Sequence, residues 1–299
     1  MKKIIFGAVA AVFLLMTAAF SALGAEKGEL EYSIIGGEAV LIGFNGEPTE
    51  LDIPDFIGCY PVTEVRDNAF YNCTSLKRIT LPDSVTRIGH HCFYGCYSLE
   101  SASLPEGLTE IGEGCFCGCT GLASAELPDT LEILPDSCFR ACTSLTEIKL
   151  PHQLKSIGNF CFAGCTSLEV PETREKLLSV GERAFFMCDR LESIYIPPSC
   201  TSLGSQAVGY TCDGNMVLRQ RALIIKGVNG SAAERYAEEN GLRFYEMEAA
   251  EEAFSAAETD NKSEDDSLCG ILTGAVILLI LILSLLRIIF TDWSDQKLK

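Results

Sequence analysis

"LKRITLPDSVTRIGHHCFYGC", residues 76–96, contains the whole pattern that decides the fold of this chain. Residues 79–81 alternate apolar and polar side chains, as a half-buried strand does, and Pro82 ends that strand because proline has no N–H to donate. A second short extended piece follows, and Gly89 permits the turn after it. The closing "CFYGC" predicts a tight helical turn.

The same pattern recurs every 23 residues through the middle of the chain. Three residue types hold this period: phenylalanine at Phe70, Phe93, Phe116, Phe139, Phe162 and Phe185; cysteine at Cys73, Cys96, Cys119, Cys142, Cys165 and Cys188; leucine at Leu76, Leu99, Leu122, Leu145, Leu168 and Leu191. A fixed period in the twenties with leucines in register is the signature of a leucine-rich solenoid, whose units bury their apolar faces against one another. We therefore predict an α/β solenoid, a leucine-rich repeat with short strands and helical turns, over residues 62–211, with six clear copies and one degenerate copy.

The two ends of the repeat array differ from it, as the ends of a solenoid must if they are to protect its apolar core. Residues 26–61 read as a β capping unit with a glycine turn at residues 36–37. Residues 212–246 read as a strand, a helix and a strand, and Ser231 with Glu234 predicts a capping box at the start of that helix.

The fifth repeat breaks the pattern. It reads "EVPETREKLL" over residues 169–178, and Pro171 stands where other units have isoleucine or alanine. Because proline donates no hydrogen bond to a strand ladder, we expect a distorted strand here. A bent sheet can shape a binding surface, but neutral drift is the explanation that we favour.

Written with x for any residue, the unit is L-x-x-I-x-L-P-x-x-L-x-x-I-G-x-x-A/C-F-x-x-C-x-x-L, which resembles the BspA-type leucine-rich repeat family of bacterial and protist surface proteins. The flanking stretches "LDIPDFIGCYPVTEVRDNAF" and "GSAAERYAEENGLRF" are also similar to segments found beside those repeats. The resemblance covers about residues 30–246 and implies a surface protein that binds host or neighbouring-cell proteins. It implies no catalytic residue, since the family has no shared active centre. The chain departs from the family where cysteine replaces alanine before phenylalanine in four units.

Two apolar segments suggest export and anchoring. Residues 1–25 have a charged start, an apolar run and small residues, as a secretory signal peptide does; an uncleaved anchor is the alternative. Residues 268–290 predict one C-terminal transmembrane helix, which we favour over a buried core helix because the run is long and nearly uncharged. We thus expect a single-pass protein of the cell membrane, with the repeats outside and residues 291–299 as a short cytoplasmic tail.

The formal net charge of −18 is concentrated near the C-terminus. Residues 247–267 are rich in Asp and Glu and poor in apolar residues, so we expect an acidic, flexible tether. The charge balance argues against nucleic acid as a partner, because nucleic-acid binding needs clustered Lys and Arg.

Fifteen cysteines are the first candidates for chemistry. Eleven occupy repeat slots that predict burial: Cys73, Cys92, Cys96, Cys115, Cys119, Cys138, Cys142, Cys161, Cys165, Cys188 and Cys200. Free cysteine behaves as a small apolar residue, so we favour a core role. Disulfides between coils stay open as the lesser alternative, and zinc is weaker because the C-x₃-C pairs repeat along an axis instead of converging. Cys117 is the one cysteine in an exposed repeat slot.

No other pattern indicates catalysis. His90, His91 and His152 all fall in polar turn slots, where we expect solvated side chains and no metal. The chain lacks G-x-S-x-G, H-E-x-x-H and a phosphate-binding glycine loop. We therefore predict neither an enzyme nor a cofactor.

The outward slots of the first strand in each unit form the candidate contact face. Its residues are Lys77, Arg78, Thr80, Glu100, Ser101, Ser103, Ser124, Glu126, Thr146, Glu147, Lys149, Glu192, Ser193 and Tyr195. The sequence thus predicts a membrane-anchored surface protein that binds an extracellular protein or another macromolecule through its solenoid. The alternatives are a structural envelope protein without a specific ligand and, less favoured, a thiol-redox protein.

Overall fold

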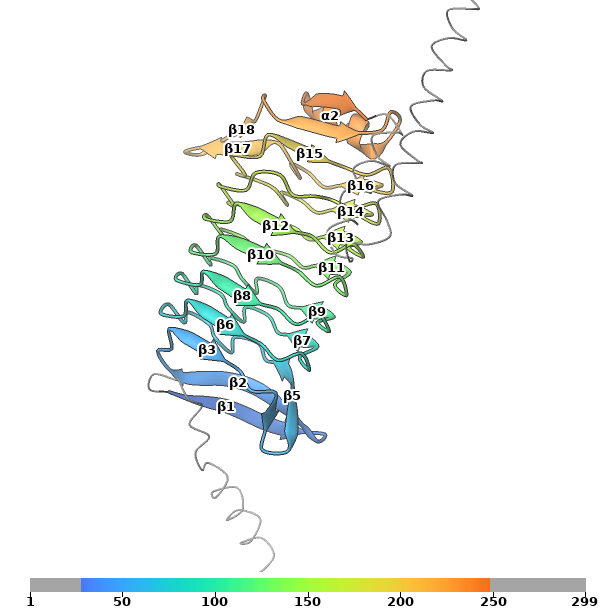
Figure 1. The fold of residues 1–299 in the computed structure, drawn as a ribbon. Helices are drawn as coiled ribbons and strands as arrows, with labels where there is room; N and C mark the ends of the chain where they lie inside the picture. Colours follow the sequence, from blue (N-terminus) through green and yellow to red (C-terminus); the bar gives the residue numbers. More distant parts are fainter. Residues whose placement is uncertain (1–27, 248–299) are drawn as a thin grey trace, which may run out of the picture. The chain divides into compact units, whose positions relative to one another are not determined.

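Successive coils of the chain stack on one another in a computed structural model that describes residues 28–247 (Figure 1). Most repeat coils, but not the fifth repeat, contribute a strand of three residues to a first strand column. Its members are β3 (Glu50–Asp52), β6 (Arg78–Thr80), β8 (Ser101–Ser103), β10 (Ser124–Glu126), β12 (Glu147–Lys149) and β15 (Ser193–Tyr195), continued by β19 (Ile224–Gly227) and β20 (Arg243–Glu246). Neighbours that pair run parallel, and the repeat strands do so at the sequence period, for example Arg78 beside Ser101.

A second strand column runs beside the first. It consists of β5 (Tyr60–Val65), β7 (Arg87–Ile88), β9 (Glu110–Ile111), β11 (Ile133–Leu134), β13 (Ser156–Ile157), β14 (Ser179–Val180) and β16 (Ser202–Leu203). Paired residues are again one repeat apart in the sequence, as Ser156 is from Ser179 and Ser179 from Ser202. The repeat pattern and its solenoid fold are therefore confirmed.

The N-terminal end is a hairpin of β1 (Gly28–Ile35) and β2 (Glu38–Gly46), with β4 (Phe56–Ile57) pairing antiparallel to β5. Its turn lies at Gly36 and Gly37, as predicted; both have positive φ angles, which glycine adopts at low cost. The predicted signal peptide, membrane helix and tail, and the tether beyond Met247, lie outside the described residues.

The C-terminal end contains α2 (Ala232–Asn240) between β19 and β20, as predicted, and a hairpin of β17 (Tyr210–Asp213) and β18 (Met216–Arg219), which was not predicted. Ser231 is the N-cap residue, but its side chain makes no cap hydrogen bond. Glu234 accepts a bond from the Gly230 N–H at 2.6 Å and not from the Ser231 N–H, so the predicted capping box is not formed. The hydroxyl of Tyr236 bonds both the N–H and the carbonyl of buried Val208. The helix thereby closes the core where the phenylalanine column ends.

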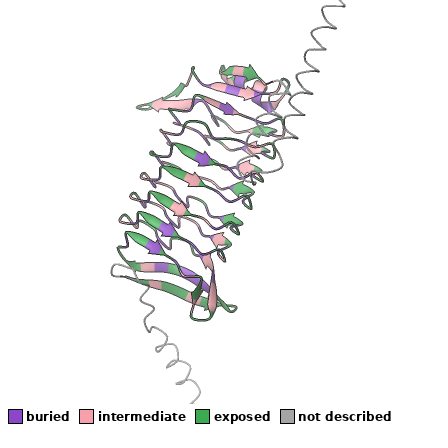
Figure 2. Ribbon diagram, viewed as in Figure 1, coloured by how far each residue is buried: buried purple, intermediate pink, exposed green. Residues whose placement is uncertain are grey.

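The core consists of columns of equivalent apolar side chains that stack from coil to coil. Neighbouring phenylalanine rings from Phe70 to Phe185 lie nearly parallel, with centroids 5.1–5.5 Å apart. This spacing is close to the distance between paired strands, about 4.8 Å, so rings and backbone advance together from coil to coil. In the first strand column the central residue of most three-residue strands is buried between two more exposed ones (Figure 2).

The segments predicted as helical turns are not helical, and α2 is the one helix among residues 28–247. The N–H groups of Phe93 and Gly95 donate to the carbonyls of Cys115 and Cys117 in the next coil, both at 2.8 Å, whereas the Tyr94 N–H donates within its own coil. A helix needs every N–H bonded along its own segment. Because alternate N–H groups bond the next coil instead, the fold is a β-solenoid rather than an α/β solenoid.

Two slots in each turn adopt the left-handed conformation. With φ angles between 50° and 81°, the first slot holds Asn68, His91, Gly114, Ser137, Phe160, Arg183 and Gln206, and the second holds Asn72, Gly95, Gly118, Ala141, Gly164 and Met187. Residues with a Cβ atom are strained there by roughly 1–2 kcal/mol. The stacked neighbours hold these turns in place against that cost.

The left-handed turn predicts that replacing alanine by glycine has opposite effects on stability inside and outside the left-handed slots. Ala141→Gly is expected to raise the free energy of unfolding by about 1 kcal/mol, because glycine relieves the strain at φ 60°. Ala123→Gly, at an exposed position outside the left-handed slots, is expected to lower it by about 0.5–1 kcal/mol. Denaturant unfolding of the two variants measures both changes, and equal destabilisation by the two would contradict the left-handed turn.

Candidate interaction face

The fourteen predicted contact residues lie along one side of the coil stack, on or next to the strands of the first column. Twelve of them are exposed, whereas Ser193 and Tyr195 on β15 are half-buried. The Tyr195 hydroxyl also donates to Glu175 at 2.9 Å. We call the outward side of β3, β6, β8, β10 and β12, with the residues just before these strands, the first strand face.

Ion pairs between coils hold the cations of the first strand face. Lys149 Nζ lies 2.6 Å from Glu126, and this hydrogen bond raises the pKa of the exposed Lys149 amine. Arg78 lies 3.6 Å from Glu50, and Lys77 lies 4.0 Å from Glu100. Exposed pairs of this kind contribute little stability because water screens them. Their effect is to keep long side chains in register on the surface.

The fifth repeat interrupts the first strand column, as its sequence predicted. Within residues 28–247, the segment 169–173 forms no strand. Pro171 lies one repeat after Ile148, the central residue of β12, and proline has no N–H to donate to the strand ladder. Only the N–H of Glu169 still donates to the preceding coil, to Thr146 at 3.2 Å. The ladder therefore ends at β12 and resumes at β15.

Two shallow hollows lie on the first strand face near this break. One of about 440 Å³ is lined by Thr146, Glu147, Glu169 and Val170, and Val170 is 51% exposed. A smaller one of about 200 Å³ is lined by Ser124, Ala125, Glu126, Glu147 and Lys149. The sequence prediction missed Glu169 and Val170, which belong to the hollow only because the strand is missing.

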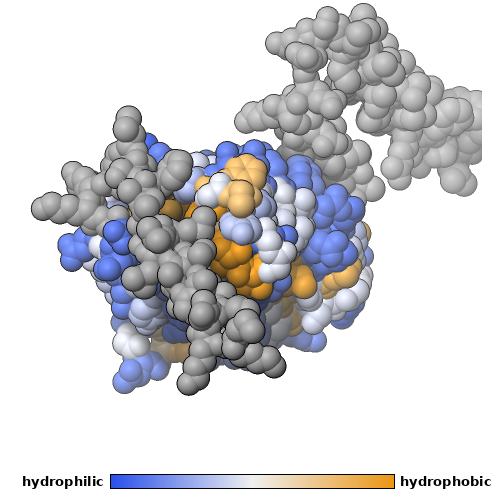
Figure 3. Space-filling model, turned by 90° about the horizontal axis from the view of Figure 1, so that it is seen from below, coloured by the Kyte–Doolittle hydropathy of each residue, from blue (hydrophilic) through white to orange (hydrophobic). Residues whose placement is uncertain are grey.

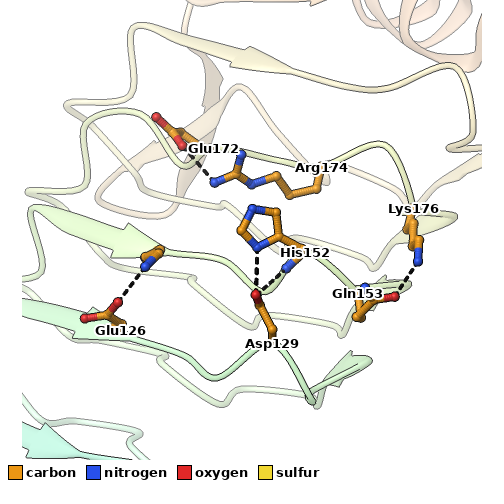
Figure 4. A network of polar contacts seen from close by, with 8 residues as sticks. Glu126, Asp129, His152, Gln153, Glu172, Arg174 and Lys176 are labelled. Carbon is orange, nitrogen blue, oxygen red and sulfur yellow. Dashed lines mark hydrogen bonds and ion pairs between the residues drawn. The ribbon is translucent and has the colours of Figure 1, made fainter. Parts of the chain in front are cut away.

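Polar contacts fasten the coils beside the break (Figure 4). Asp129 accepts the His152 backbone N–H at 2.8 Å and contacts its ring Nδ1 at 2.8 Å. Partial burial raises the pKa of Asp129, but the hydrogen bonds from His152 outweigh it and lower the pKa overall. Arg174 Nη2 donates to Glu172 at 3.1 Å, and Lys176 bonds Gln153 in the preceding coil.

The histidines are more than solvated turn residues, which corrects the sequence prediction. All three are half-buried. His90 Nδ1 accepts the backbone N–H of Glu113 at 3.1 Å, and His91 packs against Tyr94 with ring centroids 5.7 Å apart. His90 and His152 thus join neighbouring coils, whereas His91 contacts a residue of its own turn. Across the described residues 28–247, no group of three or more His, Cys, Asp or Glu side chains is placed to hold a metal.

The cysteines of the repeat slots form part of the core, as predicted. Ten of the eleven are buried, and Cys73 is half-buried. Each thiol of one column donates to the carbonyl of a phenylalanine in the preceding coil, at 3.1–3.3 Å; the donors are Cys96, Cys119, Cys142, Cys165 and Cys188. Cysteine is small enough to fit between coils, and its S–H also satisfies a buried acceptor. In the described chain, the structure leaves every cysteine as a free thiol.

Burial raises the pKa of these thiols and so makes them less reactive. It raises the pKa of Cys96 to about 12 and raises the pKa of Cys92, Cys115, Cys119 and Cys161 well above the ordinary value. A thiol reacts as its thiolate, so a raised pKa keeps it inert at neutral pH. Cys117, predicted to be exposed, is half-buried; burial raises its pKa more than nearby Arg140 lowers it.

The turn side of the coils carries an aromatic surface that the sequence prediction left without a role. Tyr71 and Tyr94 stack with ring centroids 5.0 Å apart, and Tyr97 is 52% exposed. Farther along the same side, the Arg183 guanidinium lies 5.9 Å from the ring centre of Phe160. These contacts arise because equivalent slots of neighbouring coils become adjacent in space.

The repeat pattern matches a known family. Six copies of the "BspA type Leucine rich repeat region" match residues 50–144 and 109–217, which together exceed half of the chain. The chain therefore belongs to the BspA-type leucine-rich repeat family. Comparison with curated proteins gives no match.

Solved bacterial leucine-rich repeat proteins share the fold. The Treponema pallidum protein TpLRR is 26% identical, with a TM-score of 0.55 over 72% of this chain and 95% of that one. A leucine-rich cell surface protein from Faecalibacterium prausnitzii is 24% identical, with a TM-score of 0.57 over 69% of this chain and 56% of that one. At 24% identity, the similarity to the Faecalibacterium prausnitzii protein shows only that the two proteins share a fold.

The buried thiols predict a loss of stability in alkali. The pKa of the Cys96 thiol is about 12 in the native state and 9.0 when the chain is unfolded. The contribution of the buried thiol to the free energy of unfolding is therefore complete below pH 9 and falls as the pH rises towards 12. Between pH 8 and pH 10.5, the free energy of unfolding of the parent protein should fall by about 2 kcal/mol more than that of the Cys96→Ala variant. Denaturant unfolding at both pH values measures the difference.

Cys59→Ala is the matched control, because Cys59 is exposed and its removal should leave the alkaline loss of the parent unchanged. Rapid reaction of most thiols with a maleimide in the native protein at neutral pH would contradict the buried column.

Proposed function

We propose that this protein is a surface interaction protein that binds another protein through the first strand face. The observation that carries the proposal is a long, regular, exposed side of short strands whose side chains are held in register by ion pairs between coils. Small exposed residues such as Ser101 and Ser124 let a partner approach the backbone closely. The hollow at Glu169 and Val170 gives this otherwise flat surface a concave area that a side chain of the partner can enter.

Membership of the BspA-type family supports this role, since the family resemblance implies surface proteins that bind proteins, and one solved relative is described as a cell surface protein. We propose that adhesion to a host or neighbouring cell is the form that binding takes. Both hollows described on this face are open to solvent, and the Lys149 amine beside Ser124 is paired with Glu126, which favours binding over catalysis.

We further propose that the predicted signal peptide exports the chain and that residues 268–290 anchor it in the membrane, with the repeats outside. The support is the apolar run in the sequence. Within residues 28–247, no helix is long and apolar enough to cross a membrane.

The two alternatives differ in what they require of the surface. A structural envelope protein needs no specific partner, so its exposed residues would tolerate replacement. A thiol-redox protein needs accessible thiols with lowered pKa values, whereas burial raises the pKa of Cys92, Cys96 and Cys119. The thiol role is therefore the weaker alternative.

Bulky substitutions on the first strand face test the binding proposal. The double variant Ser101→Arg and Ser124→Arg should weaken capture of a surface-protein partner at least about tenfold, because two long side chains prevent close approach. Thr109→Arg with Ser202→Arg, at exposed positions on or beside the second strand column, is the control of equal charge and should bind as the parent does. The partner is captured on the immobilised full chain, identified by mass spectrometry and titrated against all three proteins. Equal affinity for the two variants would remove the first strand face as the contact site.

Protease treatment of intact cells tests the anchoring proposal. An external protease should remove an epitope placed after Met247, in the acidic segment, and leave an epitope after Lys299 intact, because the membrane shields the tail. Permeabilised cells, in which both epitopes should be lost, provide the control. Loss of the C-terminal epitope from sealed cells would show that the tail lies outside.

A further inference from the structure

The N-terminal end of the stack presents an open strand edge. β1 pairs with β2 from Gly28 to Ile35, and no described strand lies against its other edge. An eight-residue edge offers a row of backbone N–H and C=O groups that another extended chain can bond. The opposite end is closed differently, since α2 packs against β19 and β20.

Exposed apolar side chains lie on β1 and on other strands of this end of the chain. Tyr32, Ile34 and Ile35 of β1, Ile42 of β2 and Phe56 of β4 each have between 37% and 59% of their surface exposed. Figure 3 looks onto this end and shows an apolar area (orange) with hydrophilic surface (blue) around it. Native proteins usually blunt such an edge with lysine or proline, and β1 contains neither. Exposed apolar surface next to a free edge is typical of an interaction site.

The charge of this end selects the chemistry of the partner. Residues 28–61 contain no Lys or Arg and seven acids, namely Glu29, Glu31, Glu38, Glu47, Glu50, Asp52 and Asp55. Two of these acids, Glu29 and Glu31, stand on β1 itself. A second copy of this chain would bring the same negative charge to the edge and be repelled. A cationic segment would be attracted.

We propose that the β1 edge docks an extended segment of another protein that alternates apolar residues with Lys or Arg, and that this segment adds to the sheet as a further strand. Main-chain hydrogen bonds to β1 would hold the segment, while its apolar side chains cover the exposed residues of the hairpin. Its cations would face Glu29 and Glu31. This site is separate from the first strand face, so either can fail without the other.

A capped eight-residue peptide of alternating lysine and valine is the probe. Fluorescence anisotropy of the labelled peptide against the full chain, purified in mild detergent, should show saturable binding that weakens about tenfold between 50 and 500 mM salt. The same peptide with four central backbone nitrogens methylated keeps its charge and side chains but loses donors on both edges. It should bind at least about tenfold more weakly. A glutamate–valine peptide should not bind.

Matched variants of the protein locate the site. Ile34→Glu should weaken binding about tenfold even though it adds negative charge, because it removes apolar contact at the edge. Tyr245→Glu, at an exposed position on β20 at the other end, should leave binding unchanged. Circular dichroism and the unfolding midpoint verify that both variants are folded.

Three results would overturn the proposal. Equal binding of the methylated peptide would mean charge attraction without strand pairing. Absence of any probe binding would mean that the edge is closed, for instance by residues that precede Gly28. A dimer seen by light scattering that Ile34→Glu abolishes would assign the edge to a second copy of the chain.

Discussion

Every other feature of this structure depends on one constraint: each coil must advance by the same distance as its neighbour, so that equivalent residues stack directly on one another. The phenylalanine rings set this distance in the core at 5.1–5.5 Å between centroids. Backbone hydrogen bonds keep the same spacing between coils, since the N–H groups of Phe93 and Phe116 donate to carbonyls of the next coil at 2.8 Å. Because an insertion of one residue would shift every side chain out of its column, the 23-residue period persists even where the residues in it vary.

The same constraint explains which residues the columns tolerate. A slot between coils has room for a small side chain, and Cys119 or Cys142 fills it while donating its S–H to a phenylalanine carbonyl. The left-handed turn slots accept strained residues such as Phe160 and Arg183, because stacked neighbours on both sides fix the backbone. Pro171 breaks one strand, yet the second strand column continues without interruption from β13 to β14. Local faults are absorbed because each coil is held at several independent points.

The surfaces follow from the stacking as well. Residues one period apart become neighbours, so charges pair between coils, as Lys149 does with Glu126. This leaves the first strand face as an ordered, mostly small and polar surface suited to a protein partner. The two ends of the stack lack a neighbour on one side and therefore differ chemically from the middle. The C-terminal end is closed by α2 and Tyr236, whereas the N-terminal end keeps a free edge on β1. The two surfaces that we propose as binding sites would thus place different requirements on a ligand.

The sequence by itself determined the solenoid, its period, the burial of the cysteines and the side of the coils on which the candidate face lies. These depend on a repeated pattern of apolar residues, and any stack with that pattern buries the same slots. Pro171 likewise marked the broken strand in advance, since the missing N–H is a local property. The tertiary structure alone decided the turn conformation, because "CFYGC" has the local pattern of a helical turn until alternate N–H groups find acceptors in the next coil. It also decided the partners of the cations, the bonds of the thiols and the hollow beside Val170. All of these arise between residues that only stacking brings together.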